Sequence, residues 1–164
     1  MTTLSADFQA AAQQTRACVV ALAGYRFGIE VRYAREVVVF DEYTIVPLAP
    51  AHLLGVANLR GNIVPIVDVR PLLDMTPAPA GRGVRALVVE REGVQAALLI
   101  DEVRGLEPIE RAAPTGNDSG ELIAGKLDLE GGAVTLLDVR ALLGAMGGDA
   151  VMPAARISEG GLPR

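Results

Sequence analysis

The sequence contains very few of the side chains that build metal sites and nucleophilic centres. It has one cysteine, Cys18, and one histidine, His52. A single cysteine cannot form an internal disulfide, and a lone histidine without a neighbouring cysteine cannot build a zinc site, which needs about three or four ligands. We interpret Cys18 as a small buried residue and His52 as a partly exposed loop residue. The sequence predicts no metal site and no cofactor.

Positive charge and large aromatic side chains are also scarce. The chain has one lysine, Lys126, no tryptophan, and a formal net charge of −5. Nucleic-acid binding depends on basic side chains that neutralise phosphates and on aromatic rings that stack on bases, so nucleic acid is excluded as an expected partner. No apolar run approaches the roughly 18 residues that span a bilayer, and residues 1–14 do not resemble a signal peptide. We therefore expect a cytoplasmic protein without membrane insertion.

The usual catalytic motifs are missing. The sequence has neither a glycine-rich phosphate loop ending in Gly-Lys nor a Gly-x-Ser-x-Gly nucleophile elbow. Two carboxylate pairs, Asp101 with Glu102 and Asp118 with Glu121, have the composition of a glycosidase site, but we expect both near strand ends or in loops, in contact with solvent. The sequence therefore does not indicate an enzyme.

The most informative feature is an internal repeat. The segment that contains Asp68-Val69-Arg70 reappears 70 residues later around Asp138-Val139-Arg140. The same offset relates Gly55, Leu59 and Gly61 to Gly125, Leu129 and Gly131. An offset of 69 relates Val19 and Gly24 to Val88 and Gly93. A register held over this length indicates a duplicated structural unit.

The repeat and a segment rich in proline and glycine set the expected organisation. Thr76 to Gly83 has the composition of a linker. We expect one domain over about 16–147, made of barrel one at about 16–76, a linker at 77–83 and barrel two at about 84–146, between flexible tails at 1–15 and 148–164.

Short strands with glycine turns dominate each half. Tyr25, Phe27 and Ile29 alternate with smaller or polar residues after Gly24, as in a half-buried strand. Hairpins are predicted around Gly93 and around 130–132, and Asp68 and Asp138 are each expected to cap a short helix. Closely spaced short strands favour small barrels over a parallel sheet.

Leu54 to Arg70 reads L-G-V-A-N-L-R-G-N-I-V-P-I-V-D-V-R and resembles the signature of CheW-like domains, approximately G-V-x-N-L-R-G-x-I-x-P-I-x-D-L-R. Only Val69, in place of leucine, departs from that pattern. Phe27-Gly28-Ile29 and Leu98 to Val103 also fit the family, so the resemblance covers roughly 17–146. It implies an all-β fold of two tandem five-stranded Src-homology-3-like barrels with short helices.

The resemblance also implies a function. CheW-like proteins are non-catalytic adaptors that couple chemoreceptors, the methyl-accepting chemotaxis proteins, to the histidine kinase CheA at receptor arrays. The family binds the receptor tip in a groove, and the matching positions here are Ala34, Glu36, Val37, Gly55, Asn58 and Arg60. Gly55 would allow close approach of a partner, although it could equally serve a turn, and Arg60 could bind a receptor or brace the barrel by pairing with Glu36.

For kinase binding the resemblance points to an expected strand over Tyr43, Thr44, Ile45 and Val46, and to Arg111 in barrel two. Relatives carry an aromatic residue shortly after that arginine, where this chain has Gly116. We expect the contact that closes kinase–adaptor rings to be reduced here.

Three alternatives remain open at this point. A variant of the same fold could serve another chemosensory system, such as gliding, pili or second-messenger control, or compete with the main coupler. A small β-barrel hydrolase would need a polar cleft and a perturbed titratable residue near His52. A nucleic-acid-binding barrel is disfavoured by the acidic charge balance.

Overall fold

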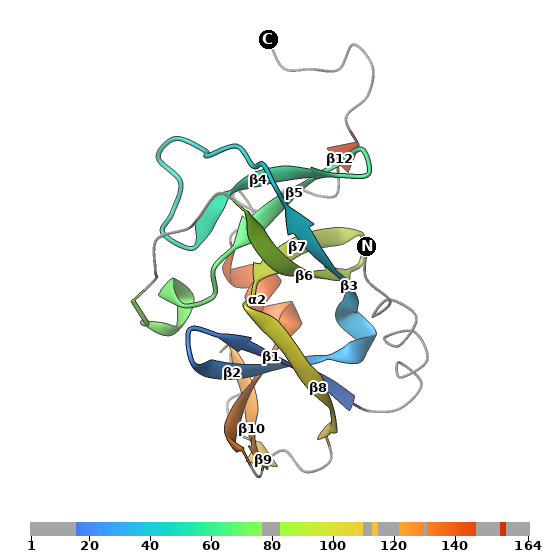
Figure 1. Cartoon of the computed structure of the whole chain (residues 1–164), viewed down its shortest axis with the longest axis vertical. Helices are drawn as coiled ribbons and strands as arrows, with labels where there is room; N and C mark the ends of the chain where they lie inside the picture. Colours follow the sequence, from blue (N-terminus) through green and yellow to red (C-terminus); the bar gives the residue numbers. More distant parts are fainter. Residues whose placement is uncertain are drawn as a thin grey trace.

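A computed structural model describes residues 16–76, 83–109, 113–114, 122–129, 131–146 and 155–156. The described chain forms two β-sheets, drawn in the lower and upper parts of Figure 1, with the short helix α2 between them. Each sheet has five long strands and one strand of two residues. The predicted all-β class, with two five-stranded barrels of the Src-homology-3-like type and short helices, is confirmed.

The two sheets are named here barrel A and barrel B. Barrel A has the strand order β8-β1-β2-β11-β10-β9, built from β1 (Arg16–Leu22), β2 (Tyr25–Glu30), β8 (Glu102–Pro108), β9 (Ala113–Pro114), β10 (Ile123–Leu129) and β11 (Gly132–Leu137). Barrel B has the order β12-β5-β7-β6-β3, with β4 paired to β5, built from β3 (Ala34–Phe40), β4 (Leu53–Leu59), β5 (Asn62–Val67), β6 (Val84–Arg91), β7 (Val94–Leu99) and β12 (Ala155–Arg156).

The barrels do not coincide with the two halves of the sequence. The first hairpin, β1–β2, pairs with β8 and β11 of the second half, and the equivalent hairpin, β6–β7, pairs with β3 and β5 of the first half. The two repeats have therefore exchanged their first hairpins. The predicted barrel limits of about 16–76 and 84–146 need this correction.

The repeat in the sequence does not show which barrel each hairpin joins. Equivalent strands carry the same apolar pattern, so a hairpin fits the barrel of either repeat. In the first half, the 3₁₀ helix η1 (Val31–Tyr33) separates β2 from β3. Val31 is buried in the cluster between the two sheets, where the chain passes from one barrel to the other.

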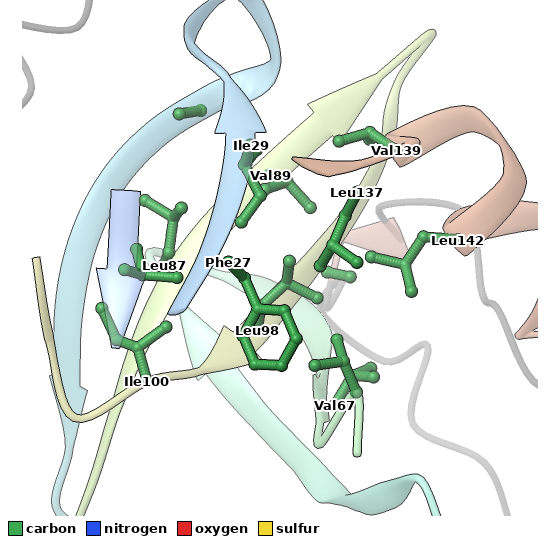
Figure 2. Close-up of a cluster of buried hydrophobic side chains, with 14 of the residues drawn as sticks. Phe27, Ile29, Val67, Leu87, Val89, Leu98, Ile100, Leu137, Val139 and Leu142 are labelled. Carbon is green, nitrogen blue, oxygen red and sulfur yellow. The ribbon is translucent and has the colours of Figure 1, made fainter. Parts of the chain in front are cut away.

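Three apolar clusters hold the structure together. Of the described residues, 18 buried ones form a central cluster between the sheets, 9 fill barrel B and 5 fill barrel A. Figure 2 shows the central cluster, where Phe27 and Ile29 of β2 lie near Leu98 of β7 and Leu137 of β11. Burying this apolar area is the main stabilising term of the fold.

Strands β1 and β6 are buried on both faces. Cys18 and Val20 point into the central cluster, while Ala17 and Val19 point into barrel A. This double burial explains why β1 reads as a continuous apolar run, Ala17 to Leu22, instead of alternating with polar residues. The same holds for Ala86 to Val89 in β6.

The two Asp-Val-Arg copies take different structures. Asp138 caps α2 (Val139–Ala145), since its Oδ1 accepts hydrogen bonds from the backbone N–H groups of Arg140 and Ala141 at 2.9 and 3.2 Å. The first copy continues with Pro71, which has no N–H, and forms only the 3₁₀ helix η2 (Pro71–Leu73). Asp138 behaves as predicted, whereas Asp68 is not a helix cap.

The tails predicted at 1–15 and 148–164 lie outside the described residues, apart from Ala155 and Arg156. These two residues pair antiparallel with Ile63 and Asn62 of β5. Within the tail that we predicted at 148–164, these two residues therefore form a short edge strand of barrel B. β5 can accept this strand because β7 pairs with it only at Ile66 and Val67.

Candidate interaction surface on barrel B

The central feature of this surface is an ion pair between Glu36 and Arg60. Glu36 lies on β3 and Arg60 in the turn between β4 and β5, so the pair joins the two ends of the barrel B sheet. Both terminal nitrogens of Arg60 donate to the two carboxylate oxygens of Glu36. The fork geometry of this contact is the strongest form of a carboxylate–arginine interaction. We call this pair the clasp.

The clasp has a buried end and an exposed end. The Glu36 side chain is 10% exposed and that of Arg60 is 59% exposed. Hydrogen bonds from Arg60 lower the pKa of the Glu36 carboxyl below its usual range, although burial opposes them. At neutral pH the ionised Glu36 carboxylate thus holds a guanidinium group at the surface.

The backbone of Arg60 supports the same interpretation. Arg60 and Gly61 form the two-residue turn of the β4–β5 hairpin and have φ angles of 51° and 86°. Glycine and asparagine normally occupy such turns, because other side chains are strained at positive φ. Asn58 supports the turn, because its Oδ1 accepts a hydrogen bond from the backbone N–H of Gly61 at 2.8 Å. An arginine in this position is explained by its side-chain contact with Glu36.

Gly55 is needed by the protein's own chain. A Cβ atom at Gly55 would collide with the backbone oxygen of Thr44 and would lie 2.8 Å from Cδ2 of Tyr43. The segment after β3 therefore occupies the space that we predicted for a partner. Close approach of a partner is not needed to explain this glycine, because Thr44 pairs with Val56 directly over it, and receptor contact at Gly55 stays a prediction.

The remaining predicted receptor-binding residues differ in accessibility. Ala34 is buried in the central cluster, and Val37 is half-buried against the same cluster. Asn58 is exposed beside Arg60. Of the six predicted positions, only Asn58 and Arg60 present exposed side chains, and both belong to the β4–β5 hairpin.

The predicted kinase-binding strand over Tyr43 to Val46 is not a strand. Only Thr44 forms a β-bridge, with two 2.8 Å backbone hydrogen bonds to Val56. The chain then turns at Leu48, which has a φ of 59°, between Pro47 and Pro50. The two prolines lack N–H donors and prevent continued pairing. Arg111 lies outside the described residues.

This loop presents apolar side chains to solvent. Ile45 is 71% exposed and Leu48 fully exposed, and Val39 at the end of β3 is 58% exposed. Sequence analysis identified Ile45 but missed Leu48 and Val39, although the flanking prolines indicated an irregular, exposed loop. These exposed apolar side chains are candidates for a protein–protein contact.

Neither candidate for nucleophilic or metal chemistry has a suitable environment. Burial raises the pKa of the Cys18 thiol to about 12, so the thiol is protonated at neutral pH. His52 is half-buried, its Nε2 is buried without a hydrogen-bond partner, and desolvation lowers its pKa. Among the described residues no group of three histidine, cysteine or acidic side chains is placed to hold a metal ion. No helix in the described part of the chain is long and apolar enough to cross a membrane.

Comparison with known proteins gives consistent matches. The family described as CheW-like domain matches residues 16–146. The chain is 32% identical over 123 residues to the probable chemotaxis protein CheW of Rhizobium etli, covering 71% of this chain and 79% of that protein. It is 39% identical over 72 residues to protein PilI of Pseudomonas aeruginosa, covering 44% and 40% of the two chains.

The fold also matches a solved structure. The scaffolding protein TtCheW of Thermoanaerobacter tengcongensis superposes with a TM-score of 0.64 at 24% identity. The match covers 76% of this chain and 89% of that protein.

Proposed function

The chain belongs to the family of CheW-like domains, and on this basis we propose that it is a non-catalytic adaptor of a chemosensory pathway. In this proposal it couples the cytoplasmic tips of chemoreceptors to the histidine kinase CheA, and it is recruited from the cytoplasm to receptor arrays at the membrane. The observation that carries the proposal is the clasp, which fixes the exposed Arg60 guanidinium on a buried carboxylate.

The receptor contact is assigned to the β4–β5 hairpin. A guanidinium group held in place loses less side-chain entropy on binding than a free one, and it can donate to carboxylates or carbonyl groups of a helical tip. Ala34, Glu36, Val37 and Gly55 then act by shaping and supporting this hairpin, while Asn58 and Arg60 contact the receptor.

The receptor assignment is tested with a matched pair of turn variants. Arg60→Gly removes the side chain but suits the positive φ of the turn. Glu92→Gly makes the same change at the equivalent turn position of the β6–β7 hairpin, where φ is 53°. We expect Arg60→Gly to weaken receptor-tip binding more than about tenfold while kinase binding persists, and Glu92→Gly to change neither. If both variants lose receptor binding, or if neither does, the receptor contact is not made by the Arg60 side chain.

The kinase contact is assigned to the loop after β3, with Tyr43, Thr44, Ile45 and Val46, and extended to the exposed Leu48. Apolar side chains that stand in solvent gain the most when a partner covers them. Ile45→Ser and Leu48→Ser are expected to weaken binding to the regulatory domain of CheA, while Tyr25→Ser on barrel A, where Tyr25 is 50% exposed, serves as the control. Arg111 remains a predicted second contact with the kinase. Gly116, where relatives carry an aromatic residue, supports the prediction that ring closure is reduced. Images that show normal hexagonal arrays, and loss of this order on mutating Arg111, would contradict that prediction.

A second candidate is a coupler of another chemosensory system, or a competitor of the main coupler. The likeness to PilI, whose name differs from that of the chemotaxis relatives, favours this candidate. Pull-down with each kinase and receptor tip of the organism separates the two. If no kinase or receptor binds, the coupling function is excluded.

A further inference from the structure

Barrel A contains a pocket that the proposed adaptor function does not use. The pocket has a volume of about 230 Å³, and its apolar lining consists of Val19 and Leu129. Its polar lining consists of Arg26, Arg104 and Glu107. Two glycines, Gly105 and Gly131, complete the wall.

The pocket occupies the position that the clasp occupies in barrel B. In barrel B, Glu36 pairs with Val88 immediately after a bulge in β3. In barrel A, Gly105 pairs with Val19 at the equivalent bulge in β8. Val19 and Val88 are counterparts in the repeat, so Gly105 stands where barrel B has Glu36. The acidic side chain that closes barrel B is replaced by Gly105 in barrel A, and among the described residues no side chain fills its place.

An arginine faces this open place. Arg26 on β2 is the counterpart of Gln95 on β7, whose Nε2 donates to Glu90 at 2.8 Å. A Cβ atom at Gly131 would collide with the Arg26 guanidinium group, which therefore lies directly on the turn before β11. Gly131 is the counterpart of Gly61, beside Arg60. Arg26 thus supplies from a neighbouring strand the positive charge that Arg60 supplies in barrel B.

The two arginines of the pocket differ in their partners among the described residues. Arg104 is paired with Glu102 at 3.1 Å. In contrast, within the part of the chain that the structure describes, no carboxylate oxygen lies within the 4.0 Å salt-bridge distance of Arg26. A guanidinium group in a partly apolar pocket attracts an anion more strongly than one in bulk water.

We propose that this pocket of barrel A binds a carboxylate group, which takes the place of the missing Glu36 side chain and pairs with Arg26. The volume is below the range of about 300–1,000 Å³ typical of pockets for larger ligands, which suits a glutamate or aspartate side chain or a small free acid. Glu107 on the wall disfavours a second negative charge, so a single carboxylate fits better than a dianion. The proposal does not depend on the adaptor function.

The test follows the Arg26 side-chain N–H signal of the full chain by NMR during titration at constant ionic strength. One arm uses propionate, with propionamide as the neutral control. The other uses the peptide acetyl-Gly-Glu-Gly-amide, with the matching glutamine peptide as control. We expect saturable shifts from a carboxylate and none from its neutral analogue. Binding by the peptide alone assigns the site to a protein side chain, and binding by propionate assigns it to free acids as well.

Two variants check that Arg26 makes the contact. Arg26→Gln installs the barrel B residue, and Gly131→Ala displaces the guanidinium while keeping its charge. The Arg26 side-chain signal is lost in Arg26→Gln, so the NMR signal of the Gly105 backbone N–H, which also lines the pocket, is followed in all variants. Both variants should raise the midpoint of the titration at least about tenfold, while Arg91→Gln, an equal charge change on barrel B, should not.

Three results would overturn the proposal. The first is the absence of saturable shifts with either carboxylate. The second is an unchanged titration in both Arg26→Gln and Gly131→Ala. The third concerns Glu130, which is the sequence counterpart of Arg60 and lies outside the described residues. If added carboxylates bind to the Glu130→Gln variant but not to the wild-type protein, the side chain of Glu130 itself pairs with Arg26 and the pocket is not a ligand site.

Discussion

Barrels A and B share one topology but use it for different chemistry. In barrel B the clasp joins β3 to the β4–β5 turn, and the equivalent place in barrel A is an open pocket. In barrel B the Asp68–Arg70 pair is buried, with exposed fractions of 1% and 3%, whereas Asp138 and Arg140 are 30% and 61% exposed. The backbone pairing tolerates these differences because strand register depends on apolar side chains and turns.

The comparison shows which positions of the duplicated unit are constrained by the fold. The turn glycines and the buried aliphatic residues recur in both barrels, since both need the same turns and the same packing. Some charged residues differ between the barrels, such as Glu36 and its counterpart Gly105, whereas Asp68 and Arg70 recur as Asp138 and Arg140 but in a more exposed setting. Charged positions that differ between the barrels are therefore the places where the two barrels acquire separate roles.

The largest expected difference between the barrels concerns the two Asp-Val-Arg copies. Asp68→Ala leaves Arg70 buried without its partner, after loss of contacts at 2.8 to 3.2 Å. Breaking one side of a buried ion pair costs about 3–5 kcal/mol of unfolding free energy. Asp138→Ala removes only a helix cap, which costs about 1 kcal/mol. Chemical denaturation of both variants measures the difference.

Arg140→Ala serves as the control for this pair, because exposed ion pairs contribute at most about 1 kcal/mol. A combined replacement of Asp68 and Arg70 by apolar residues should recover much of the lost stability, since no charge then remains buried. Equal losses in Asp68→Ala and Asp138→Ala would contradict the structural difference between the two copies.

The clasp gives the next effect, and it depends on pH. Glu36→Gln should lower the unfolding free energy by about 1–2 kcal/mol at neutral pH, because the contact is charge-assisted but Arg60 is largely exposed. The pKa of Glu36 is lower in the folded protein than in the unfolded chain. Its contribution is therefore complete above the ordinary glutamate pKa of about 4.3 and disappears as the pH falls through the folded value. The difference between wild type and Glu36→Gln should shrink over that acidic range, and a constant difference would exclude the clasp as its source.

Much of the fold could be predicted from the sequence. Alternating apolar residues, glycine turns and the repeat predicted the strands, the hairpins and the two barrels. The exchange of hairpins could not be predicted, because both arrangements bury the same side chains. Asp68 and Asp138 differ because Pro71 has no N–H to be capped, whereas Ala141 has one, and because Asp68 also binds the buried Arg70 side chain.

The candidate site could be predicted only in part. The resemblance to CheW-like domains indicated Asn58 and Arg60 as surface positions and offered the Glu36–Arg60 contact as one of two roles for Arg60. It did not show that Thr44 fills the space over Gly55, because that contact joins an irregular loop to β4 without any periodic pattern. Accessibility of Ala34 and Leu48 depends on tertiary packing, which local sequence does not specify.

His52 gives a smaller difference between the barrels. Its backbone oxygen accepts a hydrogen bond from the Asp68 N–H, as that of its counterpart Leu122 does from Asp138, both at 2.8 Å. His52→Leu installs the barrel A residue and removes the unpartnered Nε2, so we expect a gain of about 1 kcal/mol at neutral pH. Because burial lowers the pKa of His52, the unfolded wild-type chain takes up the proton first, and wild-type stability should fall below pH about 6.5. Chemical denaturation at several pH values should show that the unfolding free energy of His52→Leu lacks this decrease. If the unfolding free energies of wild type and His52→Leu change with pH in the same way, His52 is not its source.

The smallest expected effect separates Arg60 from the other hairpin turns. Ala23 and Glu92 occupy the same turn position as Arg60, with φ angles of 52° and 53°. Asparagine tolerates this conformation better, so Ala23→Asn and Glu92→Asn should each stabilise the protein by about 0.5 kcal/mol. Arg60→Asn gains the same backbone preference but loses the clasp, so it should be neutral or destabilising. Thermal unfolding of the three variants separates the side-chain contribution of Arg60 from the strain of its turn. If Arg60→Asn stabilises the protein as much as the other two variants, the clasp contributes nothing to folding and is maintained for binding alone.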